Sequence, residues 1–153
     1  MDANAESLFK EKVNHVLALK NSDKNIEAIK ELKKLLEEYP EKAVLYGLMG
    51  GLYSHQDDYE FAIKYYEKLL ELNPKSEAGS TGLFHALNET NRGDEALEEM
   101  KRYLSTYGSK KDNYKWILQD LVDGIEEPIL QPYREFILEQ ASKYNISASG
   151  TAN

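Results

Sequence analysis

The side chains best suited to chemistry in this sequence are three histidines, His15, His55 and His85. No two of them stand four residues apart, and no His-Glu-x-x-His segment occurs, so their spacing does not favour a metal site. The chain has no cysteine, which excludes disulfides, thiolate catalysis and cysteine-ligated zinc. Glycine-rich phosphate loops and nucleophile elbows are also missing from the sequence. We therefore expect a protein that is not an enzyme and that carries neither a cofactor nor a metal.

The net charge of the protein limits the classes of partner that it can bind. The 153 residues include 27 acidic and 19 basic ones, for a net charge of −8. An acidic protein repels a phosphate backbone and an anionic membrane, so we expect no nucleic acid and no membrane as partner. No apolar run approaches the ~20 residues of a membrane span, and the polar start of the chain does not resemble a signal peptide. These features predict a cytoplasmic protein.

The apolar positions recur with a period of 34 residues. Ala28, Ala62 and Ala96 are spaced in this way. Four further series share the period: Leu19, Tyr53 and Leu87; Ile29, Ile63 and Leu97; Leu36, Leu70 and Leu104; and Pro40, Pro74 and Gly108. A fixed period of this length indicates a helix–turn–helix unit that is repeated and stacked.

Each unit contains two segments with helical spacing of apolar residues. In the second unit they cover 44–55 and 59–72, and the polar residues 56–58 form the turn between them. Asn73-Pro74 ends the second segment, because proline cannot donate a helical hydrogen bond and restricts the residue before it. The first unit has its turn at 21–23 and its stop at Tyr39-Pro40, and the third has them at 91–94 and Tyr107-Gly108.

The second unit resembles a tetratricopeptide repeat. The signature positions of that family are held by Tyr46, Met49, Gly50, Tyr53, Ala62, Tyr66 and Pro74. The other two units depart from the pattern, since Val16 and Phe84 stand where a small residue is usual and Ser80 where a large one is. The resemblance covers residues 9–110. It implies an all-α fold, a right-handed α-solenoid of antiparallel helix pairs, and a function in binding other proteins.

The last third of the chain departs from the period. Residues 111–127 continue the apolar face, but Pro128 and Pro132 interrupt the next helix, at a cost of ~3 kcal/mol for a proline inside a helix. We expect a C-terminal capping helix that begins at Pro132 and covers the last apolar face. The predicted organisation is a single domain at 1–146, with repeats at 9–42, 43–76 and 77–110, a degenerate fourth unit and cap at 111–146, and a disordered tail at 147–153.

In a tetratricopeptide solenoid the first helix of each pair lines the concave face, which is where we expect a partner to bind. The predicted lining residues are Asn14, Gly47, Leu48, Gly51, His55, Ala78, Gly82, His85, Asn88, Trp116 and Gln119. Glycines inside helices are costly, and here they indicate either a shallow trough for a partner backbone or tight packing between helices. Trp116 is either an anchor for the partner or a packing residue against the C-terminal helix.

One binding mode known in this family is excluded by the sequence. A clamp for a terminal carboxylate needs asparagine, lysine and arginine where this chain has Leu48, Ala78 and Gly82, and without cations it cannot hold a carboxylate. The leading hypothesis is an adaptor that binds a peptide or helix of another protein. The alternative is a dedicated inhibitor or chaperone, such as an immunity-type protein that caps a basic toxin or a secreted partner. We expect a monomer or a weak dimer.

Two acidic clusters bear on whether that partner is basic. Asp94, Glu95, Glu98 and Glu99 begin one predicted helix, where they complement the helix dipole, and Asp120, Asp123, Glu126 and Glu127 lie near the end of another. A basic partner surface or solubility alone would each explain the second cluster.

Overall fold

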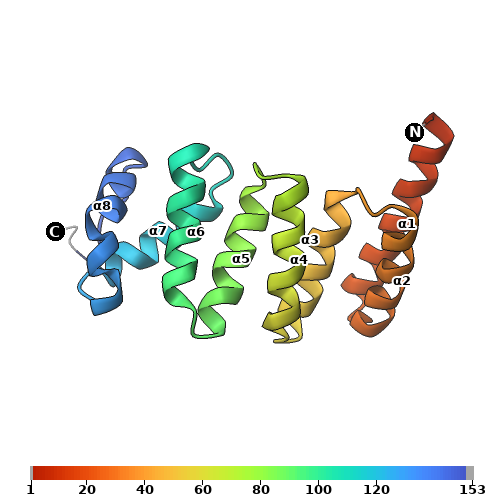
Figure 1. The fold of residues 1–153 in the computed structure, drawn as a ribbon, viewed down its shortest axis with the longest axis horizontal. Coiled ribbons are helices and arrows are strands. Elements are labelled where there is room, and N and C mark those ends of the chain that lie inside the picture. The colour runs from red at the N-terminus through yellow and green to blue at the C-terminus, as the bar shows by residue number, and fades with distance from the viewer. Residues whose placement is uncertain (1, 151–153) are drawn as a thin grey trace.

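The computed structural model describes residues 2–150, and these form eight α-helices, one 3₁₀ helix and no β-strand. Consecutive helices pack as antiparallel pairs that follow one another in a row from the N-terminus to the C-terminus (Figure 1). The predicted all-α solenoid is confirmed. Its helices are α1 (Ala3–Asn21), α2 (Asn25–Glu38), α3 (Ala43–His55), α4 (Tyr59–Leu72), α5 (Glu77–Glu89), α6 (Gly93–Thr106), α7 (Asn113–Asp123) and α8 (Arg134–Lys143), with the 3₁₀ helix η1 (Pro128–Tyr133) before α8.

The turns inside the first three pairs repeat one backbone conformation. Asp23, Asp57 and Asn91 have φ angles of 60°, 60° and 59°, in the left-handed region, and they are 34 residues apart. Aspartate and asparagine tolerate this region better than other residues with a side chain. The predicted turns are therefore confirmed, and the period of the sequence extends to the backbone of each turn.

The ends of the second helices are also where the sequence predicts them. α2 and α4 end at Glu38 and Leu72, two residues before Pro40 and Pro74. α6 ends at Thr106, and Gly108 then takes a positive φ of 72°, which glycine adopts without steric cost.

The core follows the periodic positions. Ala28, Ala62 and Ala96 are completely buried, as expected where two helices cross closely. Among the described residues, one continuous cluster of buried apolar side chains runs from Phe9 in α1 to Ala141 in α8. The stack is therefore stabilised by the apolar face that each helix pair packs against its neighbours.

The C-terminal third differs from the prediction in one detail. The capping helix α8 starts at Arg134, and Pro132 lies inside the 3₁₀ helix before it. A 3₁₀ turn tolerates prolines that an α-helix does not, so η1 carries both Pro128 and Pro132. α8 packs against α7 and buries Ile137 and Ala141, which makes it the predicted cap.

Part of the predicted disordered tail is described by the structure. Residues 147–150 run back beside α7, where the Ser149 N–H donates to Asp123 Oδ1 at 2.6 Å. Residues 151–153 lie outside the described residues.

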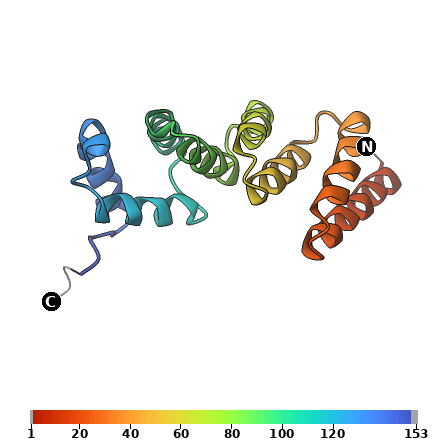
Figure 2. The ribbon, with the colours of Figure 1, turned by 90° about the horizontal axis from the view of Figure 1, so that it is seen from below.

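Seen from below, the helices α4, α6 and α8 lie on one side of the row, and α3, α5 and α7 lie on the other (Figure 2). The row bends, because α1 and α7 at its two ends reach further down in this view than α3 and α5 do. We call the side formed by α1, α3, α5 and α7 the concave face, and the opposite side the convex face.

Candidate protein-binding surface

The predicted binding residues all keep some contact with solvent. None belongs to the buried core. Six of them are exposed: Asn14, His55, Ala78, His85, Asn88 and Trp116. The other five are half-buried: Gly47, Leu48, Gly51, Gly82 and Gln119.

The structure brings three of these residues, Gly47, Leu48 and Ala78, together around one hollow. This α3–α5 hollow has a volume of about 380 Å³ and lies between the first halves of α3 and α5. Its full lining is Ala43, Val44, Gly47, Leu48, Tyr66, Leu69, Asn73, Ser76, Ala78 and Gly79. Tyr66 and Leu69 come from α4, so the second helix of the pair also takes part in the surface.

A second hollow lies next to the first on the same face. This α1–α3 hollow measures about 250 Å³ and contains the predicted Asn14, together with Phe9, Lys10, Val13 and Val44. Val44 lines both hollows and is 49% exposed, so it forms the ridge between them. Four of the eleven predicted residues therefore line these two hollows.

The predicted histidines lie at the other end of their helices. His55 Nε2 is 4.0 Å from Asp23 Oδ1 of the first pair, and both side chains are largely exposed. The His85 ring meets the Tyr59 ring edge-on at 5.8 Å between centroids. Each of these contacts joins two neighbouring helix pairs.

Trp116 is the largest exposed side chain of the concave face. It is 76% exposed on α7, so the structure excludes the alternative in which it packs against the C-terminal helix. It stands 34 residues from Gly82, 68 from Leu48 and 102 from Asn14, the same place in each unit.

The neighbouring Gln119 is already engaged. Its amide donates to the Ser147 carbonyl at 2.9 Å and to Ser149 Oγ at 3.3 Å. Residues 147–149 therefore already accept the hydrogen bonds of Gln119, a side chain that the sequence predicts to contact a partner.

Most glycines of α3 and α5 have a packing role, because they lie against side chains of α4. A Cβ at Gly82 would come within 2.5 Å of the Tyr66 ring, and one at Gly50 within 2.8 Å of the same ring. A Cβ at Gly79 would come within 2.7 Å of Leu69. Of the two alternatives that the sequence leaves open for the helix glycines, Gly79 and Gly82 therefore fit tight packing between helices. Their second-helix contacts are not visible in the spacing of first-helix residues. At Gly51 the nearest atom would be 3.9 Å away, so a Cβ there would make no close contact.

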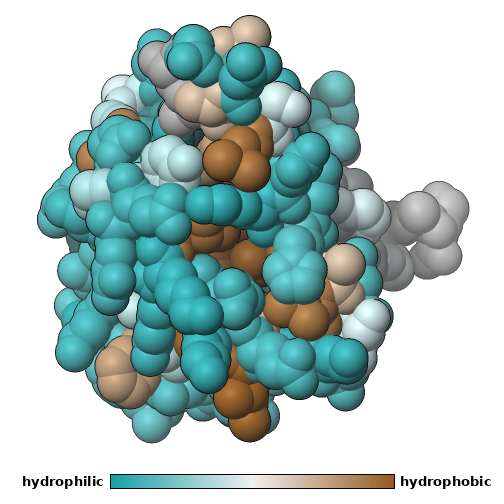
Figure 3. Space-filling model, turned by 90° about the vertical axis from the view of Figure 1, so that its right-hand side faces the viewer, coloured by the Kyte–Doolittle hydropathy of each residue, from teal (hydrophilic) through white to brown (hydrophobic). Residues whose placement is uncertain are grey.

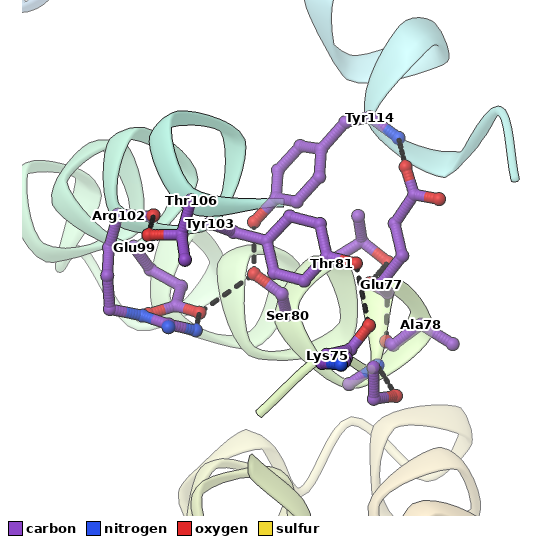
Figure 4. Close-up of polar contacts among 12 residues, drawn as sticks. Lys75, Glu77, Ala78, Ser80, Thr81, Glu99, Arg102, Tyr103, Thr106 and Tyr114 are labelled. Atoms are coloured by element: carbon purple, nitrogen blue, oxygen red, sulfur yellow. Dashed lines mark hydrogen bonds and ion pairs between the residues drawn. The ribbon is translucent and has the colours of Figure 1, made fainter. Parts of the chain in front are cut away.

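A buried polar network joins α5, α6 and α7 (Figure 4). Ser80 Oγ donates to Glu99 Oε1 at 2.8 Å and shares a 2.5 Å hydrogen bond with Tyr114 Oη. Burial raises the pKa of the Tyr114 phenol, which keeps it neutral in this network. Ser80 stands where the family pattern has a large residue, and the Tyr114 ring of the next unit explains the substitution.

The Glu77 carboxylate anchors the segment before α7. Glu77 is only 4% exposed and accepts hydrogen bonds from the Ser109 hydroxyl and from the Lys111 N–H, the latter at 2.7 Å. The Tyr114 N–H, at the start of α7, also donates to it, at 3.4 Å. A carboxylate at a helix N-terminus is favoured by the helix dipole. Glu77 therefore fixes α7, and with it Trp116, on the stack.

The convex face has its own groove, of different character. It lies between α4 and α6, has a volume of about 510 Å³, and has Leu83 and Leu87 at its floor. Two arginines in its lining pair with glutamates of α6: Arg92 with Glu95 at 2.6 Å and Arg102 with Glu99 at 2.6 Å. Three more acidic residues complete the lining: Glu67, Asp94 and Glu98. Glu98 also accepts a hydrogen bond from Tyr133, which raises the pKa of Tyr133 to about 12.

The N-terminal end of the stack is the third hollowed surface. Figure 3 shows hydrophobic side chains in a depression surrounded by hydrophilic ones. A hollow of about 340 Å³ between α1 and α2 has Leu8 and Leu35 in its lining. Its other residues are polar or charged, and the ion pairs Lys12–Glu38 and Lys34–Glu31 cross or border it.

Two further observations concern sites of other kinds. Among residues 2–150, no group of three or more histidine, aspartate or glutamate side chains is placed to hold a metal ion. In the same part of the chain, no helix has the length and apolar character that a bilayer span needs.

Residues 43–76 match the model of the tetratricopeptide repeat family. The second helix pair is a tetratricopeptide repeat. The match has the boundaries that the sequence predicts for the second unit and confirms the resemblance. A comparison with curated proteins finds no match.

Solved structures with a similar fold cover most of the stack. The structure titled "MamA MSR-1 C2" superposes with a TM-score of 0.65 at 18% identity, covering 94% of this chain and 82% of that one. The Sgt2 TPR domain from Aspergillus fumigatus superposes with a TM-score of 0.56 at 16% identity, covering 95% and 86%. At these identities the likeness establishes the tetratricopeptide fold.

Proposed function

We propose that this protein is a non-catalytic interaction module that binds a segment of another protein along its concave face. The observation that carries the proposal is Trp116, a large apolar side chain that is 76% exposed on α7. Tryptophan buries 150–250 Å² when it is covered and is enriched among the residues that dominate interface energies. Glu77 holds α7 in place, so this side chain is presented on a fixed element.

The experiment compares Trp116→Ala with Ile26→Ala. Ile26 lies on α2 and is 79% exposed, so it controls for the loss of an exposed apolar side chain elsewhere. The tagged protein captures its partner from cells, and the affinity of each variant for that purified partner is then measured. Trp116→Ala should weaken binding by about 2 kcal/mol or more, roughly 30-fold, with less than about 0.5 kcal/mol of lost stability. A partner that binds both variants as tightly as the parent would refute the proposal.

An inhibitor or chaperone of a basic partner is the second candidate function, and the convex groove favours it. Five carboxylates face two arginines in that groove, so its local field is negative. Contacts made there should weaken steeply with salt, whereas contacts with Trp116 should not. Glu67→Lys combined with Asp94→Lys should abolish binding of a basic partner and leave binding through the concave face unchanged.

A further inference from the structure

The face of α7 that carries Trp116 is already partly covered by the protein's own chain. Residues 147–150, which we call the return segment, follow α8 and pass below α7 on the side of the concave face (Figure 2). Asn145 turns the chain there with a positive φ of 59°, as the turns inside the first three helix pairs do. The Ile146 N–H donates to the Ala141 carbonyl at 2.8 Å, and this bond closes the end of α8 before the return segment begins.

Two side chains of α7 hold the return segment. Asp123 accepts both donors of Ser149, its N–H at 2.6 Å and its hydroxyl at 2.9 Å. The Gln119 amide donates to the Ser147 carbonyl at 2.9 Å and to Ser149 Oγ at 3.3 Å. Between the two exposed serines, Ala148 is half-buried and packs against the core. The return segment is therefore bound as a short peptide would be, through main-chain groups, hydroxyls and one small apolar side chain.

A competitor can replace these contacts. All four hydrogen bonds are exposed to solvent, and the exchange of such bonds for bonds to water has a small net cost. None of residues 147–150 is fully buried. Segments with few buried contacts open without global unfolding, so the return segment can leave α7 while the helix stack stays folded.

The partner that we propose to bind at Trp116 would meet the return segment. Trp116, Gln119 and Asp123 are spaced by three and four residues, so they lie on one face of α7. At 1.5 Å per residue, Asp123 is about 10 Å from Trp116 along the helix. A stable interface covers about 800 Å² on each side, a patch of roughly 16 Å radius, and its strongest contacts lie near the centre. An interface centred on Trp116 therefore includes both residues that hold the return segment.

We propose that the return segment is an internal competitor, which a partner must displace from Gln119 and Asp123 in order to cover Trp116. The inference rests on the proposed function, because it concerns the regulation of the same surface. A segment attached in about nine of ten molecules weakens the apparent affinity about tenfold. A change that releases the segment strengthens binding by the same factor.

A peptide titration tests the return segment without the partner. Ser149→Pro removes both donors to Asp123, and Ser147→Ala is its control because it keeps the carbonyl that Gln119 contacts. In the ¹⁵N-labelled full chain, Ser149→Pro should move the signal of the Gln119 side-chain amide, and Ser147→Ala should not.

The probe is the acetylated and amidated peptide Ile-Ser-Ala-Ser-Gly, which copies residues 146–150. Added to the Ser149→Pro chain, it should reverse the change at Gln119 with half-saturation at about 1 mM or below, because a tethered segment acts at a millimolar effective concentration. The peptide Ile-Ser-Ala-Pro-Gly should have no effect. An unmoved Gln119 signal in Ser149→Pro, or equal effects of the two peptides, would overturn the proposal.

The competition itself is measured with the partner purified by capture on the parent protein. Ser149→Pro should bind it about tenfold more tightly than the parent, and Ser147→Ala should stay within about twofold of the parent. If Ser149→Pro binds no more tightly while Trp116→Ala weakens binding, this inference is wrong and the proposed function stands. If Trp116→Ala binds as tightly as the parent, the proposed function is wrong, and this inference with it.

Discussion

Substitution of Gly82 by alanine tests how the repeats are packed together. The Tyr66 ring, which is 9% exposed, lies between α3 and α5. A new Cβ at Gly82 would stand 2.5 Å from this ring. The ring has little room to move, because Gly50 packs against the same ring, where a Cβ would lie 2.8 Å from it. Alanine at this position must therefore displace either the ring or a helix.

The magnitude follows from two opposing effects. Overpacking of a confined core site costs about 3 kcal/mol at the upper end of its usual range. Alanine is the better helix former by about 1 kcal/mol. Gly82→Ala should therefore lower the free energy of unfolding by about 2 kcal/mol. Gly51→Ala, whose Cβ would be 3.9 Å from the nearest atom, should raise it by up to about 1 kcal/mol.

Urea denaturation followed by circular dichroism at 222 nm measures both variants against the parent. The same measurement in a Tyr66→Leu background isolates the cause, because without the ring Gly82→Ala should become neutral or stabilising. If Gly82→Ala is as stable as the parent, or if its cost is the same with and without the Tyr66 ring, then Gly82 does not serve to admit Tyr66.

Three further changes test other parts of the structure. Ala62→Trp should lower the free energy of unfolding by about 3 kcal/mol, because Ala62 is fully buried, and an unchanged melting temperature would show that the repeat frame is misplaced. Glu77→Gln should cost about 2 kcal/mol and speed amide exchange at Lys111, and unchanged exchange would refute the anchoring role. Hydrogen bonds from Ser149 lower the pKa of Asp123 below its usual 3.8. Residues 147–150 should therefore stay bound to α7 while the Asp123 carboxylate is ionised, and should become protease-sensitive as the pH falls through the lowered pKa. Asp123→Asn should remove this transition, and a transition that persisted in that variant would contradict the assignment.

The fold was largely predictable because its determinants are local and periodic. The turn residues Asp23, Asp57 and Asn91, the stops at Pro40 and Pro74, and the buried alanines are each visible in a 34-residue frame. The start of α8 was misplaced by two residues, since the sequence pattern did not distinguish a 3₁₀ turn from the first turn of an α-helix. Helix periodicity predicts which face of a helix is buried, but it does not predict whether the turn before the helix is 3₁₀ or α-helical.

The candidate binding surface was less predictable because it depends on contacts between units. The spacing of α3 and α5 residues identifies Gly47, Leu48 and Ala78, but the contribution of Leu69 from α4 appears only once the helices are stacked. The anchoring of α7 by Glu77 joins residues 32 to 37 positions apart, with no signature in the sequence.

On the concave face, residues that stabilise the stack also line the surface proposed to bind a partner, so the two roles can be separated only at some positions. Tyr66 and Leu69 pack against the glycines of α3 and α5, and the same two side chains line the α3–α5 hollow. A larger residue at Gly79 or Gly82 would therefore disturb the stack as well as the hollow, and lost binding in such a variant would not identify a contact. Val44 and Ala78 are exposed at the rim of the α3–α5 hollow. Unlike the glycines, neither of them makes room for a buried side chain by lacking a Cβ. Substitutions at these rim positions change the surface alone, so the binding role of the concave face is best measured there.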